Sequence, residues 1–241
     1  MKTLNILLAL LAINGTSIMA NDIFPTSPET INVSFGKSYV PVGFDDNDRT
    51  QITIEGSFPN TCYKVGPYAT KVDLKTQTIN VQQQAYRYNG ICLQMIVPFN
   101  QVIDLGILPK GEYKIVDATT GKALSSIRID QATKSEADEF LYAPMTDAYI
   151  STDPETGIHT LAVLGAFSDR CTVFEDIKVN YTSDVIVVQP IVKHIADRRN
   201  CGQQKVRFVK TVQLKDGLTG LYLLHVRSMN GQAINKMVDL P

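Results

Sequence analysis

The chain has 241 residues, of which 23 are basic and 24 acidic, so its formal net charge is −1. This balance argues against a protein that binds nucleic acid through non-specific electrostatic attraction. A mature chain of about 220 residues is long enough for one large domain or for two domains of ordinary size.

The first twenty residues have the pattern of a secretory signal peptide. Lys2 precedes an apolar run over 4–13, and Ala20 provides a small residue for signal peptidase. We predict that residues 1–20 are removed, that the mature chain begins near Asn21, and that the protein is periplasmic or secreted. The alternative is an ordinary buried helix. No later stretch has about eighteen consecutive apolar residues, so no transmembrane segment is expected after cleavage.

An internal repeat divides the rest of the chain. At an offset of 109 residues, the separation of Cys62 from Cys171, the sequence aligns with itself without a gap. The aligned pairs include Gly56 with Gly165, Phe58 with Phe167, Cys62 with Cys171, Cys92 with Cys201, Val97 with Val206, Phe99 with Phe208, and Tyr113 with Tyr222. We interpret this pattern as tandem duplication of one domain. The predicted organisation is an N-terminal arm or first strand at 21–38, repeat one at 39–130, a connector at 131–141 and repeat two at 142–241.

Both repeats have the pattern of β-structure. Short runs rich in Val, Ile, Tyr, Phe and Thr alternate with turn residues about every ten residues. The run 185–188 is apolar at every position, as expected for a central strand. We predict an all-β protein of two tandem immunoglobulin-like or fibronectin-like β-sandwich domains. The connector at 131–141 has a helix-forming composition, and Ser135 with Asp138 matches a capping box, so one or two helical turns are expected there.

The four cysteines occupy equivalent positions in the two repeats. Four cysteines permit three pairings, and an exported chain is expected to form disulfides. If each repeat is self-sufficient, Cys62 pairs with Cys92 and Cys171 with Cys201. The alternative is a metal site or a redox pair, but the sequence has no Cys-x-x-Cys and no closely spaced cysteine–histidine cluster.

Each repeat carries Gly-x-Phe-x-x-x-Cys, then a second cysteine, Val-x-Phe and Gly-x-Tyr. This arrangement resembles domains of uncharacterised exported bacterial proteins with tandem disulfide-containing immunoglobulin-like β-sandwich repeats. The chain has no Trp, and its cysteine spacing is shorter than in antibody domains. The resemblance implies a β-sandwich and assigns no functional residue.

No motif points to catalysis. The sequence has no Gly-x-Ser-x-Gly elbow, and His159, His194 and His225 have no histidine at the aligned positions of repeat one. No motif fixes a partner that would make any of them a general base. We therefore predict a non-catalytic protein without a cofactor.

The acidic run at 45–48 is the one candidate for a metal site. Asp45, Asp46 and Asp48 offer carboxylate oxygens of the kind that bind calcium. The run lacks the glycine and the distal glutamate of an EF-hand loop, and Asp and Asn are also good turn formers. We favour a turn and predict no metal.

Two segments that precede the second cysteine of each repeat are predicted to be binding loops. The first is aromatic, and aromatic side chains give large contact areas at a small entropic cost. The second is basic, which suits an acidic partner. The candidate residues are Tyr86, Arg87 and Tyr88 in repeat one, and Lys193, His194, Arg198 and Arg199 in repeat two.

These observations favour an exported binding or structural module of the bacterial cell envelope or periplasm that acts through protein–protein contacts. The expected partner is another envelope or extracellular protein. One alternative is a secreted inhibitor or effector that blocks another protein. A further alternative is an enzyme with a site between the two repeats, where converging titratable groups would be required.

Overall fold

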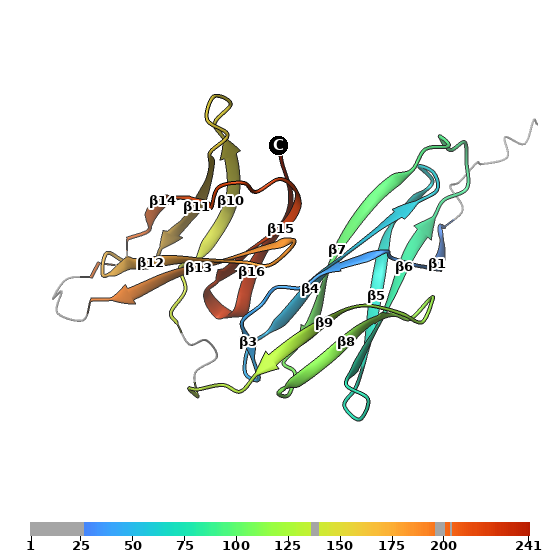
Figure 1. Ribbon diagram of the computed structural model, residues 1–241, viewed down its shortest axis with the longest axis horizontal. Helices are drawn as coiled ribbons and strands as arrows, with labels where there is room; N and C mark the ends of the chain where they lie inside the picture. The colour runs from blue at the N-terminus through green and yellow to red at the C-terminus, as the bar shows by residue number, and fades with distance from the viewer. Residues whose placement is uncertain (1–26, 136–139, 196–200, 203) are drawn as a thin grey trace, which may run out of the picture.

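The computed structural model describes residues 27–135, 140–195, 201, 202 and 204–241, which fold into two β-sandwich domains (Figure 1). Strands β1 to β9 form the first domain and β10 to β16 the second. Among the described residues the one helical element is a single 3-10 turn, Met229–Gly231. The predicted all-β fold with two sandwich domains is confirmed. No helix within the described residues is long and apolar enough to cross a membrane.

The first domain has one three-stranded and one six-stranded sheet. The smaller sheet has the order β2 (Lys37–Tyr39), β4 (Thr50–Phe58), β7 (Val97–Gly106). The larger sheet has the order β1 (Glu29–Val33), β6 (Thr78–Arg87), β8 (Gly111–Asp117), β9 (Lys122–Asp130), β3 (Phe44–Asp45), and β5 (Tyr63–Asp73) pairs with the remaining edge of β6.

The second domain has a three-stranded and a four-stranded sheet. The first has the order β10 (Met145–Thr152), β11 (His159–Phe167), β14 (Val206–Gln213). The second has the order β12 (Thr172–Tyr181), β13 (Val185–His194), β15 (Gly220–Ser228), β16 (Gln232–Leu240).

The two domains share one plan of strand pairing. In the first, β6 runs parallel to β8 and β8 antiparallel to β9; in the second, β13 runs parallel to β15 and β15 antiparallel to β16. The parallel pairs place Thr78 opposite Lys114 and Val185 opposite Leu223. Strands β1 and β3 of the first domain have no counterpart among the strands of the second.

Strand β13 is buried on both faces because it lies between two cores. Ile186 and Val188 point into the core of the second domain. Val185 and Val187 pack instead with Tyr39 of the first domain. The continuous apolar run therefore marks a strand whose outer face is covered by the neighbouring domain, not only by its own sandwich.

The segments outside the sandwiches differ in part from expectation. The described residues of the predicted connector, 131–135 and 140–141, form no helix, and residues 136–139, which include Asp138 of the predicted capping box, lie outside the described residues. Strand β1 lies within the segment predicted to be an arm or first strand. The predicted signal peptide lies outside the described residues.

Two equivalent glycines allow an aromatic ring to lie against a neighbouring strand. Gly56 is opposite Phe99, and Gly165 is opposite Phe208. A Cβ atom at Gly56 would lie 2.5 Å from Cζ of Phe99. At Gly165 it would lie 2.2 Å from the carbonyl oxygen of Pro144 and 2.4 Å from Cζ of Phe208. The Gly-x-Phe motif thus leaves the space that each ring fills.

We predict that Gly165→Ala destabilises the protein by about 1–3 kcal/mol, since the added methyl group meets backbone as well as a ring. Gly56→Ala should cost less, because the nearest backbone atom there, the carbonyl oxygen of Ser34, lies 3.2 Å from the added Cβ and not 2.2 Å. The free energy of unfolding from urea denaturation of the oxidised protein measures both. Gly36→Ala is the matched control, because nothing lies within 4 Å of the added atom. Equal stability of the three variants would contradict this account.

Candidate functional site

The disulfides lie at one end of each sandwich. Cys62 is bonded to Cys92 and Cys171 to Cys201, with Cα–Cα distances of 5.3 and 5.1 Å. The predicted pairing within each repeat is therefore confirmed. Each bridge connects the turn between two consecutive strands, β4–β5 or β11–β12, to the segment that leads into β7 or β14.

The aromatic segment before Cys92 is mostly strand, which corrects the predicted loop. Tyr86 and Arg87 belong to β6, where they pair with residues of both β1 and β5. Arg87 also forms an ion pair with Glu29. Tyr88 is the candidate that lies beyond the strand, 37% exposed, with Nζ of Lys64 5.4 Å from its ring centroid. Sheet pairing thus engages the backbone of two of the three candidates in repeat one, and the side chain of Arg87 stays exposed.

The residues that follow form an exposed apolar surface. We name residues 88–96, between β6 and β7, the apolar loop. Ile91, Leu93, Met95 and Ile96 are 104%, 66%, 53% and 67% exposed, and no residue of the loop is charged. Exposed apolar side chains normally occur singly, and a contiguous group of them marks an interaction site.

The apolar loop is fixed on the sandwich by more than its disulfide. The backbone N–H of Leu93 donates to Oγ1 of Thr61 at 3.0 Å, and the N–H of Thr61 donates to the carbonyl oxygen of Leu93 at 3.2 Å. The N–H of Tyr88 donates to the carbonyl oxygen of Cys62 at 2.9 Å. These bonds order the loop before any partner arrives, which lowers the entropic cost of binding.

The basic candidates of the second domain do not form a loop where the structure describes them. Lys193 and His194 are the last residues of β13, and Lys193 pairs with Glu175 at 3.4 Å. Arg198 and Arg199 lie outside the described residues. The fold brings a ring nitrogen of His194 within 4.8 Å of the sulfurs of Cys171 and Cys201, a grouping that sequence spacing did not show. Both sulfurs are joined in the disulfide, so neither is a thiolate ligand.

A buried arginine of the second domain reaches into the first. We name the contact between Arg227 and Asp48 the interdomain joint. Arg227 Nη1 lies 3.3 Å from Oδ2 of Asp48, with side chains 8% and 7% exposed. Nη1 also donates to Oη of Tyr142 at 3.4 Å, and Nη2 donates to the carbonyl oxygen of Gly43. The guanidinium carbon lies 4.8 Å from the ring centroid of Phe44.

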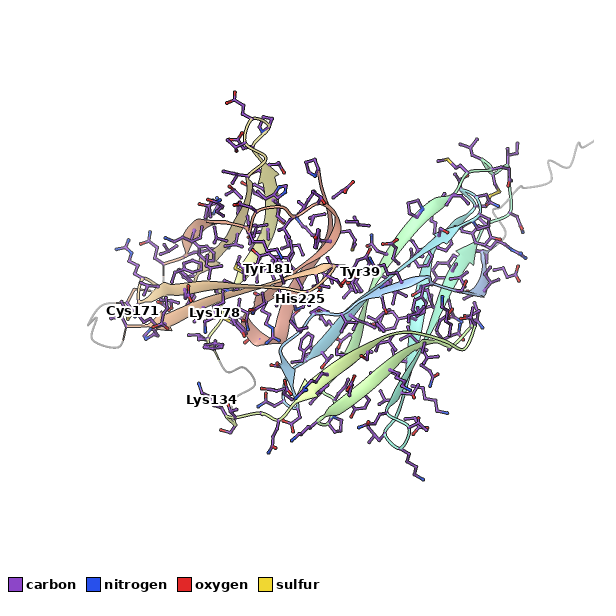
Figure 2. All side chains as sticks on the ribbon, viewed as in Figure 1. Tyr39, Lys134, Cys171, Lys178, Tyr181 and His225 are labelled. Carbon is purple, nitrogen blue, oxygen red and sulfur yellow. A yellow bond between two sulfur atoms is a disulfide. The ribbon has the colours of Figure 1, made fainter. Side chains whose placement is uncertain are left out.

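Further contacts extend on both sides of the joint. Figure 2 shows Tyr39 and His225 where the two domains meet. Tyr39 donates to Oε2 of Glu55 at 2.5 Å while its ring packs on the second domain. Nδ1 of His225 is 2.7 Å from Oδ1 of Asn235, whose Nδ2 donates to Oε1 of Gln51 at 3.0 Å. The two domains are therefore connected by apolar, ionic and hydrogen-bonded contacts.

The acidic run serves the fold around the joint. Asp45 accepts a hydrogen bond from the N–H of Asn47 at 3.1 Å, and Asp48 accepts one from the N–H of Asp45 at 3.2 Å. Asp46 accepts one from the N–H of Ala132 at 2.8 Å. Each carboxylate is thus engaged with backbone or with Arg227, as the turn interpretation expects.

Burial dominates the titration of the groups at the joint. It raises the pKa of Asp48, although the Arg227 cation and the hydrogen bond from Asp45 lower it. Burial also lowers the pKa of His225 to about 4; Arg227 lowers it further and the bond to Asn235 opposes both. Nε2 of His225 has no hydrogen-bond partner. His159 is structural, because Nε2 contacts the carbonyl oxygen of Leu218 at 2.9 Å and Nδ1 contacts Oγ1 of Thr152 at 2.8 Å.

Sequence reasoning missed the joint, and of the apolar loop it predicted only Tyr88. Arg227 directly follows the mostly apolar strand run 221–226, and nothing in the sequence indicated Asp48 as its partner. The apolar loop did leave a signal, namely four large apolar residues in an uncharged stretch around Cys92.

These features define a protein of two joined β-sandwich domains, one of which exposes a disulfide-bonded apolar loop. Residues 52–116 match the model of a family described as the ORF11 beta-sandwich domain. The match begins within β4 and ends within β8, so it includes Cys62, Cys92 and the whole apolar loop. No curated protein and no solved structure matches the chain.

We predict that Arg227→Met destabilises the protein by about 3–5 kcal/mol at pH 7, because Asp48 is left buried without its counterion. The measurement is urea unfolding, and Asp48→Asn in the same background should recover part of the loss. Arg128→Met is the matched control, since that arginine forms an exposed ion pair with Asp130. A loss no larger than that of the control would contradict a structural role for the joint.

We also predict acid destabilisation that depends on His225. The unfolded chain binds a proton there near pH 6.5, whereas the folded protein does so only near pH 4. The contribution of neutral His225 to the free energy of unfolding is therefore complete above about pH 6.5 and is lost as the pH falls toward 4. Between pH 7 and pH 5 the protein should lose about 2 kcal/mol more than His225→Gln. Parallel pH profiles of the unfolding free energy for the two proteins would contradict this.

Proposed function

We propose that this protein is an exported, non-catalytic binding module of the bacterial cell envelope, which contacts a partner protein through the apolar loop. The observation that carries the proposal is the exposure of Ile91, Leu93, Met95 and Ile96 on one ordered loop. Such a surface is costly to leave in water and gains free energy when a partner covers it.

The energy available at this loop is sufficient for specific binding. Full burial of a large aliphatic side chain contributes roughly 1.5–3 kcal/mol. Four such residues supply several kilocalories per mole, from which the cost of association must be subtracted. Because the disulfide and the Thr61–Leu93 hydrogen bonds already order the loop, little of this gain is spent on fixing its conformation.

Export is supported by the disulfides together with the pattern of the first twenty residues. Both cystines persist most readily in an oxidising compartment. The similarity to a β-sandwich family covers the apolar loop and supports a scaffold that presents it. Two alternative functions remain predictions: a secreted inhibitor or effector, and an enzyme with a site between the domains.

A cleft beside the joint is the place where the enzyme alternative would have to be sought. It has a volume of about 210 Å³, and its walls include Asp45, Asp130, Tyr142 and Arg227. The guanidinium group of Arg227 there already donates hydrogen bonds to Asp48, Tyr142 and Gly43. Because these bonds occupy it, they favour the binding function over a reaction in the cleft.

We predict that Leu93→Asp with Ile96→Asp abolishes binding to the partner without affecting folding, since both side chains are exposed. The test is in-cell crosslinking of the tagged protein in its native host, followed by mass spectrometry. Leu74→Asp is the matched control, because Leu74 is also 58% exposed but lies in the β5–β6 turn. Crosslinked products that persist unchanged in the double variant would overturn the proposal.

A further inference from the structure

The disulfide end of the second domain brings two sulfur atoms and a ring nitrogen together. Cys171 directly precedes β12, His194 ends β13, and Cys201 lies in the segment before β14. The two sulfurs and a ring nitrogen of His194 all lie within 4.8 Å of one another. Figure 2 shows Cys171 at the outer end of the domain. We name these three residues the sulfur–imidazole cluster, the one group of this kind in the part of the chain that the structure describes.

Backbone hydrogen bonds hold the cluster together in addition to the disulfide. The N–H of Ile195, the residue after His194, donates to the carbonyl oxygen of Cys171 at 2.8 Å. The N–H of Arg170 donates to the carbonyl oxygen of Cys201 at 3.0 Å. None of these contacts uses a sulfur atom, so the proximity of the three segments does not depend on the sulfur–sulfur bond alone.

The first domain has a disulfide at the equivalent place but lacks the imidazole. His194 pairs across the sheet with the residue that follows the first cysteine of its repeat, and Arg87 does the same in repeat one. A guanidinium group stays protonated in proteins and offers no lone pair to a metal ion. Arg87 forms an ion pair with Glu29 instead. The two repeats therefore differ in metal-binding capacity at the same position of the fold.

We propose that the second domain binds one Zn²⁺ ion through Cys171, His194 and Cys201 whenever its disulfide is not formed. This inference goes beyond the proposed function and does not depend on it. Thiolate sulfur and imidazole nitrogen are preferred zinc ligands, at about 2.3 and 2.0–2.1 Å from the ion. In a tetrahedral site such atoms lie about 3.5–3.8 Å from one another, so donors within 4.8 Å need small shifts only. The fourth position is left for water.

The bridge and the metal use the same sulfur atoms and exclude each other. Cysteines enter the chain as thiols, and zinc binding to Cys171 and Cys201 releases their two protons. When a disulfide oxidant then takes two electrons from the two thiolates, the bond between Cys171 and Cys201 forms. The oxidant leaves as two thiolates, and Zn²⁺ is released unchanged in charge. The reduced domain therefore holds the ion, and the oxidised domain holds the bridge.

Zinc gives the reduced domain the same covalent connection that the disulfide gives the oxidised one. Both link the start of β12 to the segment that leads into β14. Because the energy of metal binding adds to the free energy of folding, zinc should stabilise the reduced second domain. The reduced first domain, which has Arg87 in place of the imidazole, should gain nothing from it.

The test is Co²⁺ binding to the reduced mature chain without oxygen, because cobalt thiolate complexes absorb visible light. The wild type should bind one Co²⁺ per chain, and Zn²⁺ should displace it since such sites prefer zinc. The oxidised protein should bind none. His194→Ala should weaken the affinity more than about tenfold. Lys205→Ala is the matched control, because Lys205 is exposed in the segment after Cys201 and lies outside the cluster.

Two double variants identify the thiols that hold the ion. Cys62→Ser with Cys92→Ser leaves the thiols of the second domain and should bind Co²⁺ like the wild type. Cys171→Ser with Cys201→Ser should bind none. A reduced wild type without bound metal would overturn the inference. So would an affinity that is unchanged in His194→Ala, or metal that is still bound without Cys171 and Cys201.

Circular dichroism keeps the test decisive if the reduced chain does not fold without metal. In that case Zn²⁺ should restore the β-sheet spectrum of the reduced wild type and of Lys205→Ala, because binding and folding are then one process. The same amount of Zn²⁺ should leave His194→Ala unfolded. An unfolded wild type that does not respond to Zn²⁺ would also contradict the proposed site.

Discussion

The relative orientation of the two β-sandwiches depends on a cation that is buried between them. Arg227 reaches from β15 into the first domain, where Asp48, the carbonyl oxygen of Gly43 and the face of Phe44 surround its guanidinium group. A buried ion pair adds little net stability over an apolar contact, but the guanidinium of Arg227 also donates to Oη of Tyr142 and to the carbonyl oxygen of Gly43, which restrains its position. The joint therefore fixes the direction in which each sandwich points, and with it the separation of the two disulfide ends.

The fold was predictable because strand patterns and the repeat are local or linear features of the sequence. Apolar residues alternate with polar ones along β6, where Ile79, Val81 and Ala85 are buried, and such alternation is visible without a structure. The spacing of the cysteines gave their pairing once the repeat was recognised. The run at 185–188 was correctly interpreted as a central strand, yet the neighbour that covers its second face lies more than a hundred residues away in the sequence.

The candidate surfaces were less predictable because exposure depends on pairing. Tyr86 and Arg87 resemble loop residues in composition, but β1 and β5 both pair with this part of β6. Ile91 and Leu93 resemble core residues, yet they lie outside any strand, between β6 and β7, and are exposed.

The disulfides also bear on how the chain matures. Each bridge joins a cysteine to the next one along the chain, at a separation of 30 residues, and neither bridge crosses between domains. Domains of an exported chain fold as units in the order in which they emerge. If this chain is exported as proposed, an oxidase that joins cysteines in their order of emergence makes both native bridges directly. The first domain would then be oxidised and closed while the second is still in transit, without reshuffling of mispaired cysteines.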